Sequence, residues 1–170
     1  MAQERKPAIS NHLISKIVPA TTPEHIDAIR ALFRSYEQLL NVDLCFQGFQ
    51  AELAGLPGRY APPEGALLIA FLGDEAAGCV AMRQHQQGVC EMKRLFVRPI
   101  YRRCGIGNRL ARAVIQAAKD AGYTAMVLDT LTSLGPAMRL YQRIGFKPRA
   151  PYYENPLPNV VYWELNLLKR

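Results

Sequence analysis

A glycine turn preceded by arginines is the part of this sequence best suited to bind an anion. It lies between a segment typical of a strand and a segment typical of a helix, and it consists of Arg102, Arg103, Cys104, Gly105, Ile106 and Gly107. The N–H groups at the start of a helix favour a negative charge, and glycine lets the backbone approach a phosphate closely. The turn therefore predicts a phosphate-binding site.

The positive charge of the chain is concentrated around this turn. The formal net charge is +7. Residues 92–119 contain no acidic residue and eight basic ones, which are Lys93, Arg94, Arg98, Arg102, Arg103, Arg109, Arg112 and Lys119. A nucleic-acid surface is one interpretation, but the chain has no nucleic-acid-binding motif. We expect a pocket for a compact anion, and no nucleic-acid partner.

Two common phosphate-binding motifs do not fit the turn. The GxxxxGK[ST] pattern of a P-loop is absent, and a dinucleotide turn needs a small residue where this chain has Leu110. A GxG sequence by itself often forms only a tight connection between a strand and a helix. The residues on both sides of the turn therefore have to decide its function.

Two longer patterns resemble the signatures of the GNAT acetyltransferase superfamily. Residues 91–99, followed by Arg102-x-x-Gly105-x-Gly107, resemble its acyl-CoA signature, a strand followed by [QR]xxGx[GA] at the start of a helix. The second signature lies downstream, and its matching residues are Ala137, Leu140, Tyr141, Gly145 and Phe146. The order of the expected elements is similar to this superfamily along nearly the whole chain.

The resemblance implies acetyl-CoA as the acyl donor and no metal. The pyrophosphate would lie on the glycine turn, and the pantetheine arm would run along the preceding strand. The cofactor-binding residues implied in this way are Leu95, Phe96, Val97, Arg102, Arg103, Cys104, Gly105, Ile106, Gly107, Asn108 and Arg109.

The resemblance also implies two catalytic residues. Attack of an amine on a thioester needs a neutral nitrogen, a polarised carbonyl and a protonated leaving thiolate. Glu91 matches the general base of histone-type members and Tyr141 matches a general acid, while a backbone N–H near Leu95 or Phe96 would polarise the carbonyl. The alternatives are a glutamate paired with a nearby cation and a tyrosine of the core. Many members have an asparagine where this chain has Leu134, which puts cofactor contacts from that turn in doubt.

We therefore expect an N-acetyltransferase that transfers an acetyl group to a primary amine of a small molecule or peptide by direct attack. The alternative is a module that senses acyl-CoA without turnover. Direct transfer leaves no role for Cys104 as a nucleophile. The sequence does not identify the acceptor, but the residues expected around it are Phe46, Phe49, Tyr60, Tyr152, Tyr153, Glu154 and Asn155.

The elements that would position these residues follow from the apolar patterns. A helix begins at Thr22, which is followed by Pro23 and an acidic residue, and it reaches Leu40. Further helices are expected at 46–53, 107–121 and 137–144. Strands are expected at 11–18, 66–72, 77–83, 89–97, 124–128, 147–153 and 160–167.

This order predicts an α+β fold in a single domain, residues 11–170, after a mobile tail formed by residues 1–10. The resemblance implies the GNAT fold, a mixed and mostly antiparallel sheet of six to seven strands, flanked by about four helices, whose fourth and fifth strands splay apart. A homodimer through the closing strands stays open.

The cysteines and the apolar runs suggest a cytoplasmic protein. The four cysteines lack a CxxC pair, so we expect reduced thiols. A metal site formed by Cys79, His85 and Cys90 is conceivable but lacks a fourth ligand. The longest apolar runs are far below the roughly 18 residues of a membrane span, and the first residues do not resemble a secretory signal.

Overall fold

A seven-stranded sheet forms the centre of the protein, with the strand order β1-β2-β3-β4-β5-β7-β6. The structure is a computed structural model that describes residues 15–169; the expected tail and the start of the expected first strand lie outside them. Neighbouring strands are antiparallel except for β4 and β5, which are parallel. The strands are β1 Ser15–Pro19, β2 Ala66–Leu72, β3 Glu75–Gln86, β4 Val89–Val97, β5 Ala125–Leu131, β6 Lys147–Arg149 and β7 Val160–Asn166.

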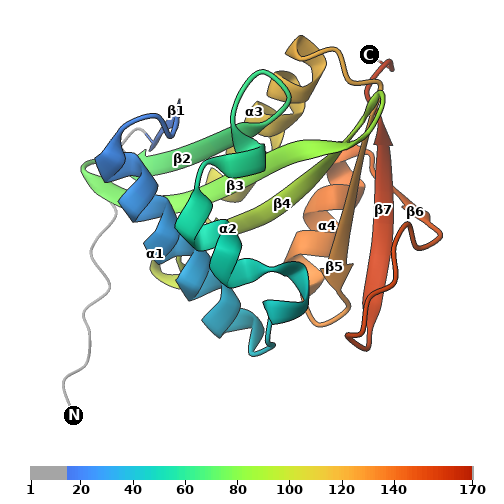
Figure 1. Ribbon diagram of the computed structural model, residues 1–170, viewed down its shortest axis with the longest axis horizontal. Coiled ribbons are helices and arrows are strands. Elements are labelled where there is room, and N and C mark those ends of the chain that lie inside the picture. Colours follow the sequence, from blue (N-terminus) through green and yellow to red (C-terminus); the bar gives the residue numbers. More distant parts are fainter. Residues whose placement is uncertain (1–14, 170) are drawn as a thin grey trace.

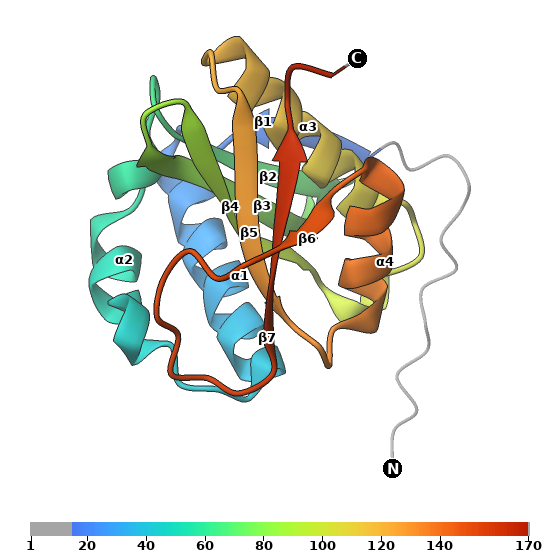
Figure 2. The ribbon, with the colours of Figure 1, turned by 90° about the vertical axis from the view of Figure 1, so that its right-hand side faces the viewer.

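Two pairs of α-helices cover the two faces of the sheet. Helices α1 (Pro23–Leu40) and α2 (Phe49–Gly55) lie on one face, and α3 (Ile106–Asp120) and α4 (Gly135–Ile144) lie on the other (Figure 2). Each face has its own apolar core: Phe33 and Phe49 belong to the first, Leu110 and Met126 to the second. The expected α+β sheet fold is confirmed.

Helix α1 begins and ends at residues that favour those positions. The Thr22 hydroxyl accepts a hydrogen bond from the His25 N–H (3.1 Å), and Pro23 occupies the first helical position. Asn41 closes the helix in the left-handed conformation (φ 51°). The expected helix over residues 22–40 is therefore confirmed to within a residue at each end.

Strands β4 and β5 pair over a short stretch and then part. Val89–Glu91 is in register with Ala125–Val127, and the pairing stops there although both strands continue. Figure 1 shows the two strands close together at one end and diverging toward the other. The expected splay is confirmed, and it opens the sheet from Met92 and Leu128 onward.

A β-bulge in β4 lies at the point where the strands part. Cys79 of β3 is opposite Phe96 and Ala81 is opposite Lys93, so one residue of β3 faces two residues of β4. The bulged Arg94 has a φ of +59°, which is uncommon for a residue other than glycine. Such a bulge bends the strand and re-aims its side chains.

The closing hairpin differs from its prediction. The strand expected over residues 147–153 ends at Arg149, because Pro148 and Pro151 cannot donate to a strand ladder and limit pairing. Residues 150–159 leave the sheet and reach over the face covered by α1 and α2 (Figure 2). Tyr152 and Tyr153 are thereby placed beside the site described below.

The second expected helix is also interrupted. A short 3-10 helix (Cys45–Gln47) precedes α2, and Gly48 separates them with a φ of +70°. Glycine adopts this left-handed conformation without the steric cost of a Cβ, so the chain changes direction there. Gln47 accepts a hydrogen bond from Lys93 of β4, and Glu52 of α2 pairs with the next residue, Arg94.

Candidate active site

A cavity of about 60 Å³ lies where β4 and β5 part. Residues 92–95 of β4 and 128–131 of β5 form two of its walls. The end of α1, the start of α4 and the segment before β7 complete it. The cavity therefore lies at the interrupted pairing and is lined from both faces of the sheet, by Tyr36 of α1 on one and Tyr141 of α4 on the other.

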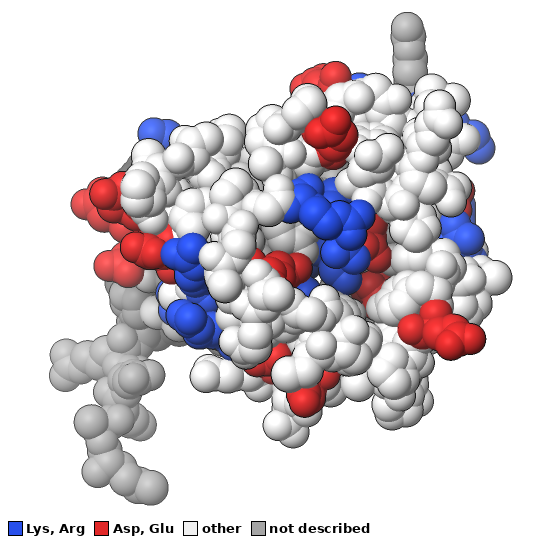
Figure 3. All heavy atoms as spheres, viewed as in Figure 1, with Lys and Arg blue, Asp and Glu red and all other residues white. Residues whose placement is uncertain are grey.

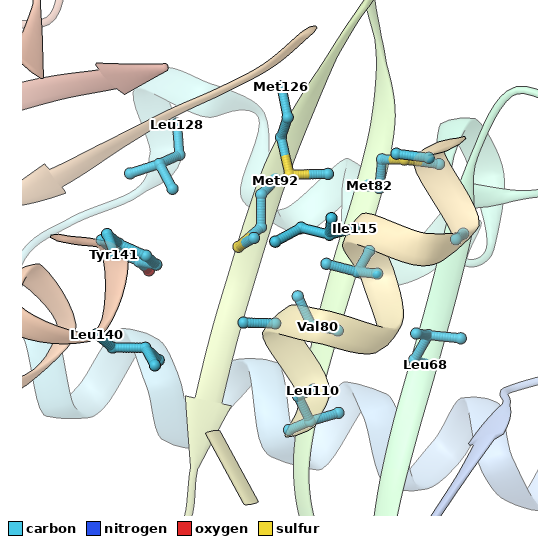
Figure 4. Close-up of a cluster of buried hydrophobic side chains, with 14 of the residues drawn as sticks. Leu68, Val80, Met82, Met92, Leu110, Ile115, Met126, Leu128, Leu140 and Tyr141 are labelled. Atoms are coloured by element: carbon cyan, nitrogen blue, oxygen red, sulfur yellow. The ribbon is translucent and has the colours of Figure 1, made fainter. Parts of the chain in front are cut away.

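Tyr141 lines this cavity from the α3 and α4 side. Its side chain lies in the apolar cluster shown in Figure 4, together with Leu140 and Leu128, and its ring packs against Phe146 with centroids 5.6 Å apart. Burial raises the pKa of the phenol above its ordinary value. The hydroxyl thus stays protonated at neutral pH and can supply a proton inside the cavity.

Glu91 lies one residue before the cavity begins, and its carboxylate is fully engaged. Arg83 Nε donates to Oε1 (2.9 Å), and the Tyr152 hydroxyl donates to Oε2 (2.7 Å). Burial acts to raise the pKa of Glu91, but the charges of Lys93 and Arg83 and the Tyr152 hydrogen bond outweigh it and lower that pKa. The alternative considered from the sequence, a glutamate paired with a nearby cation, is therefore seen in the pair with Arg83. The catalytic role of Glu91 stays a prediction.

Asp129 is a cavity residue that the sequence analysis missed. Its Oδ2 accepts hydrogen bonds from the Tyr153 hydroxyl (2.5 Å) and from Asn155 Nδ2 (3.3 Å). The signal in the sequence was a single carboxylate in β5, a strand whose other residues are apolar except for Thr130, since an aspartate is costly there unless its charge is used. Tyr153 and Asn155 were expected near the acceptor, and the structure places both beside this carboxylate.

Lys93 is one of two cations that line the cavity, the other being Arg94. Only 7% of Lys93 is exposed, and Nζ donates a hydrogen bond to Gln47 Oε1 (3.3 Å). Burial lowers the pKa of its ammonium group, although the negative charges of Glu91 and Asp129 oppose that effect. The lysine that the sequence grouped with the arginines of the glycine turn therefore belongs to a different site.

Arg94 is likewise buried, and it ties α2 to the bulge of β4. Its Nε lies 3.0 Å from Glu52 Oε2, and its guanidinium lies 5.2 Å from the centre of the Phe49 ring. Glu52 also accepts a hydrogen bond from the Tyr60 hydroxyl. Phe49 and Tyr60, which were expected around the acceptor, therefore pack in the core beside this ion pair.

The glycine turn has the form expected of an anion site. Helix α3 begins at Ile106 after Gly105 (φ +76°), which has no side chain that could cap the first N–H groups of the helix. The residues around it that are exposed are Arg102, Arg103, Cys104, Gly105, Asn108 and Arg109. Backbone N–H groups at this helix terminus are thus accessible to a phosphate.

The start of α3 lies next to the end of β4. A Cβ built on Gly107 would lie 3.7 Å from Val97 Cγ2 and 3.9 Å from Leu140 Cδ2, so the start of α3 contacts both β4 and α4. Leu95 lines the cavity itself. Phe96 points to the opposite face and packs against Tyr36, which leaves only its backbone for a cofactor.

Comparison with known proteins agrees with this arrangement. Residues 27–146 match the model of the acetyltransferase (GNAT) family. The chain belongs to this family. An uncharacterised N-acetyltransferase of Schizosaccharomyces pombe is 46% identical over 151 residues, which cover 86% of this chain and 91% of that protein.

Solved structures show the same GNAT fold. An acetyltransferase of Streptococcus agalactiae has a TM-score of 0.75 at 19% identity, over 89% of this chain and 98% of that protein. A Bacillus subtilis acetyltransferase in complex with CoA has a TM-score of 0.54 at 25% identity, over 62% of this chain and 78% of that protein. The chain is an acyltransferase of this family.

The cysteines of this GNAT protein are separated by the sheet. Cys79 is buried in the core under α1, and Cys90 is buried in the core under α3. The two thiols therefore lie on opposite faces and do not form the metal site considered with His85.

None of the helices in residues 15–169 has both the length and the apolar composition that crossing a membrane requires.

The basic segment of the GNAT chain is divided by folding. Lys93 and Arg94 are buried within the sheet, whereas Arg102 and Arg103 lie on the surface at the glycine turn. On the face shown in Figure 3, acidic and basic side chains are interspersed.

Proposed function

We propose that this GNAT acetyltransferase transfers the acetyl group of acetyl-CoA directly to a primary amine of a small molecule or peptide. One observation carries the proposal: the cavity between β4 and β5 has the protonated Tyr141 on one face of the sheet and the Asp129 carboxylate at its wall. Leu95 lines the same cavity, and Val97, two residues further along β4, lies close to the start of α3.

The donor would bind along β4 and α3. The pyrophosphate of acetyl-CoA would accept hydrogen bonds from the N–H groups of residues 103–109, with Arg102 or Arg103 adding charge. The pantetheine arm would run beside Leu95 and Val97, in the gap where β5 no longer pairs with β4. The related Bacillus subtilis acetyltransferase that is in complex with CoA supports this choice of cofactor.

The transfer needs no covalent enzyme intermediate. The amine nitrogen attacks the thioester carbon, a C–N bond forms, and the tetrahedral intermediate then loses the thiolate as the C–S bond breaks. Tyr141 would donate its proton to that thiolate. A backbone N–H near Leu95 or Phe96, next to the bulge, would stabilise the negative carbonyl oxygen.

A carboxylate must accept the proton that leaves the amine. Glu91 is the residue expected from the sequence, but both of its oxygens are bonded to Arg83 and Tyr152. Asp129 lines the cavity, and its hydrogen bonds from Tyr153 and Asn155 both go to Oδ2. We therefore favour Asp129 as the proton acceptor, with Glu91 holding Arg83 and Tyr152 in place.

Calorimetric titration with acetyl-CoA, and with free CoA beside it, tests the donor. We expect one binding site per chain. Release of thiol should then be followed with a panel of polyamines, amino acids, aminoglycosides and peptides, and the acetylated product identified by mass spectrometry. Absence of acetyl-CoA binding would refute the proposal, whereas binding without acetylation of any amine would favour the acyl-CoA sensor.

A further inference from the structure

We propose that the acceptor is an amine that carries a carboxylate close to its amino group, as an α-amino acid does. Asp129 would contact the amino group and Lys93 would bind the carboxylate. This inference rests on the proposed acetyl transfer and specifies its acceptor class.

The first observation is that the Lys93 ammonium group has no anionic partner in the protein. Among residues 15–169, no carboxylate oxygen lies within ion-pair distance of Lys93 Nζ. Its hydrogen bond goes to the neutral amide oxygen of Gln47. The two neighbouring cations differ, because Arg83 is paired with Glu91 and Arg94 with Glu52.

The second observation is that the Asp129 carboxylate, like the Lys93 ammonium group, has no oppositely charged partner among the described residues. Its Oδ2 accepts hydrogen bonds from two neutral groups, the Tyr153 hydroxyl and the Asn155 amide. In the described part of the chain, no donor bonds Oδ1 and no cation pairs with the carboxylate. Lys93 and Asp129 thus line the same cavity with opposite charges, and each is hydrogen-bonded only to neutral neighbours, whereas Arg94, which also lines the cavity, is paired with Glu52.

The parting of the strands explains why the two groups do not neutralise each other. Lys93 belongs to β4 and Asp129 to β5, beyond the last paired residues Glu91 and Val127. A molecule between the strands with opposite charges on adjacent carbon atoms would complement both groups at once. Charge-assisted hydrogen bonds of this kind are roughly twice as strong as neutral ones.

A purely structural role would not favour a lysine at this position. Burial lowers the pKa of Lys93, which means that the surroundings disfavour its charged form. An apolar residue of similar length would fill the same wall without that desolvation cost. The cost is offset if a substrate carboxylate binds there.

The wild-type protein provides the first test. With acetyl-CoA saturating, kcat/KM is measured for a panel of free amino acids, for their amides and for the amines that lack the carboxylate. We expect each accepted amino acid to exceed its amide by roughly 10- to 100-fold, the range expected for one charge-assisted hydrogen bond. Equal or better use of the amides would overturn the inference while leaving acetyl transfer intact.

The variant Lys93→Met provides the second test. It should lower kcat/KM for the amino acid by roughly 10- to 100-fold. The loss for the amide should be far smaller, because the amide has no carboxylate that could bind Lys93. Lys16→Met, an exposed lysine of β1 remote from the cavity, is the matched control and should change neither value. Equal losses on both acceptors would contradict the inference; if the variant does not fold, the wild-type comparison decides.

Discussion

At the scale of single residues, Tyr141 combines burial with access to the cavity. A tyrosine of the core and a tyrosine that donates a proton look alike in the sequence, because both fit the apolar face of a helix. In the structure Tyr141 belongs to the apolar cluster and also lines the cavity, so its position is compatible with either role. Its role as general acid therefore has a direct test.

We expect Tyr141→Phe to lower kcat by about 100-fold, the lower end of the range for a general acid, with little change in acetyl-CoA affinity. The reason is that the leaving thiolate loses its proton donor while the ring still fills the core. Steady-state kinetics and calorimetry measure the two quantities. Tyr123→Phe removes a hydroxyl that bonds the Glu64 carbonyl elsewhere and is the control; an unchanged kcat for Tyr141→Phe would exclude the acid role.

Glu91 should show its pairing in the pH dependence of stability. The pKa of Glu91 in the folded state lies below the ordinary value of 4.5. The ionised carboxylate therefore stabilises the fold at pH values above 4.5, and this stabilisation is lost as the pH falls through the folded-state pKa. We expect Glu91→Gln to lower the free energy of unfolding by about 1–3 kcal/mol at pH 7, and this difference to shrink as the pH falls below 4.5.

Urea denaturation at several pH values measures this difference. Glu75→Gln, at an exposed position at the start of β3, is the control and should have little effect at any pH. A penalty for Glu91→Gln that is the same in acid and at neutral pH would show that the charge of the carboxylate is not what stabilises the chain.

At the scale of elements, the buried ion pair between Arg94 and Glu52 connects α2 to the bulge of β4. The side chains are only 3% and 13% exposed. Removing one partner leaves a buried charge, so Glu52→Gln should lower the free energy of unfolding by about 3–5 kcal/mol. Arg94→Met together with Glu52→Gln should cost less than the sum of the two single variants.

Chemical denaturation of the four proteins completes this double-mutant cycle. The exposed pair Arg149–Glu164 is the control, because its side chains are 33% and 43% exposed and such pairs contribute only about 0–1 kcal/mol. Additive effects of Glu52→Gln and Arg94→Met would mean that α2 is held to the sheet by its apolar contacts alone.

The elements also show where local patterns were sufficient. Helix α1 and strands β2, β4 and β7 were close to their predicted bounds because apolar spacing and capping residues are local signals. The strand predicted beyond Arg149 was wrong, because aromatic side chains of this segment donate hydrogen bonds to groups far away in the sequence. Tyr152 donates to Glu91, and Tyr153 donates to Asp129. No local pattern reports such partners.

At the scale of the whole molecule, the two helix pairs and the open sheet should bind the donor as one unit. A ligand that binds only the folded state at 100 times its dissociation constant stabilises it by about 2.7 kcal/mol. For a domain of this size that corresponds to a rise in melting temperature of roughly 5–11 °C. We expect acetyl-CoA to produce such a rise.

Thermal denaturation with increasing acetyl-CoA measures this effect. The Tyr141→Phe variant should show the same rise as the wild type, because its cofactor contacts are intact. No rise in either protein at concentrations that saturate related acetyltransferases would contradict the assignment of the glycine turn and β4 to the donor.

The edge of the sheet bears on the open question of a homodimer. Strand β6 forms that edge and consists of Lys147, Pro148 and Arg149, all exposed. Charged residues and proline on an edge strand oppose pairing with a second chain. A dimer, if it forms, would therefore have to use another surface than the free edge of β6.

The sequence alone determined the fold class, the family and the position of the glycine turn, because these depend on contiguous patterns and on residues a few positions apart. Only the tertiary structure decided which charges meet in the cavity. Lys93 and Asp129 are 36 positions apart in the chain. Both line the same cavity because β4 and β5 are neighbouring strands whose pairing stops before these residues. Pairing across a sheet, and the burial that goes with it, depends on the packing of all its elements, so the charged groups that line the cavity could be recognised only in three dimensions.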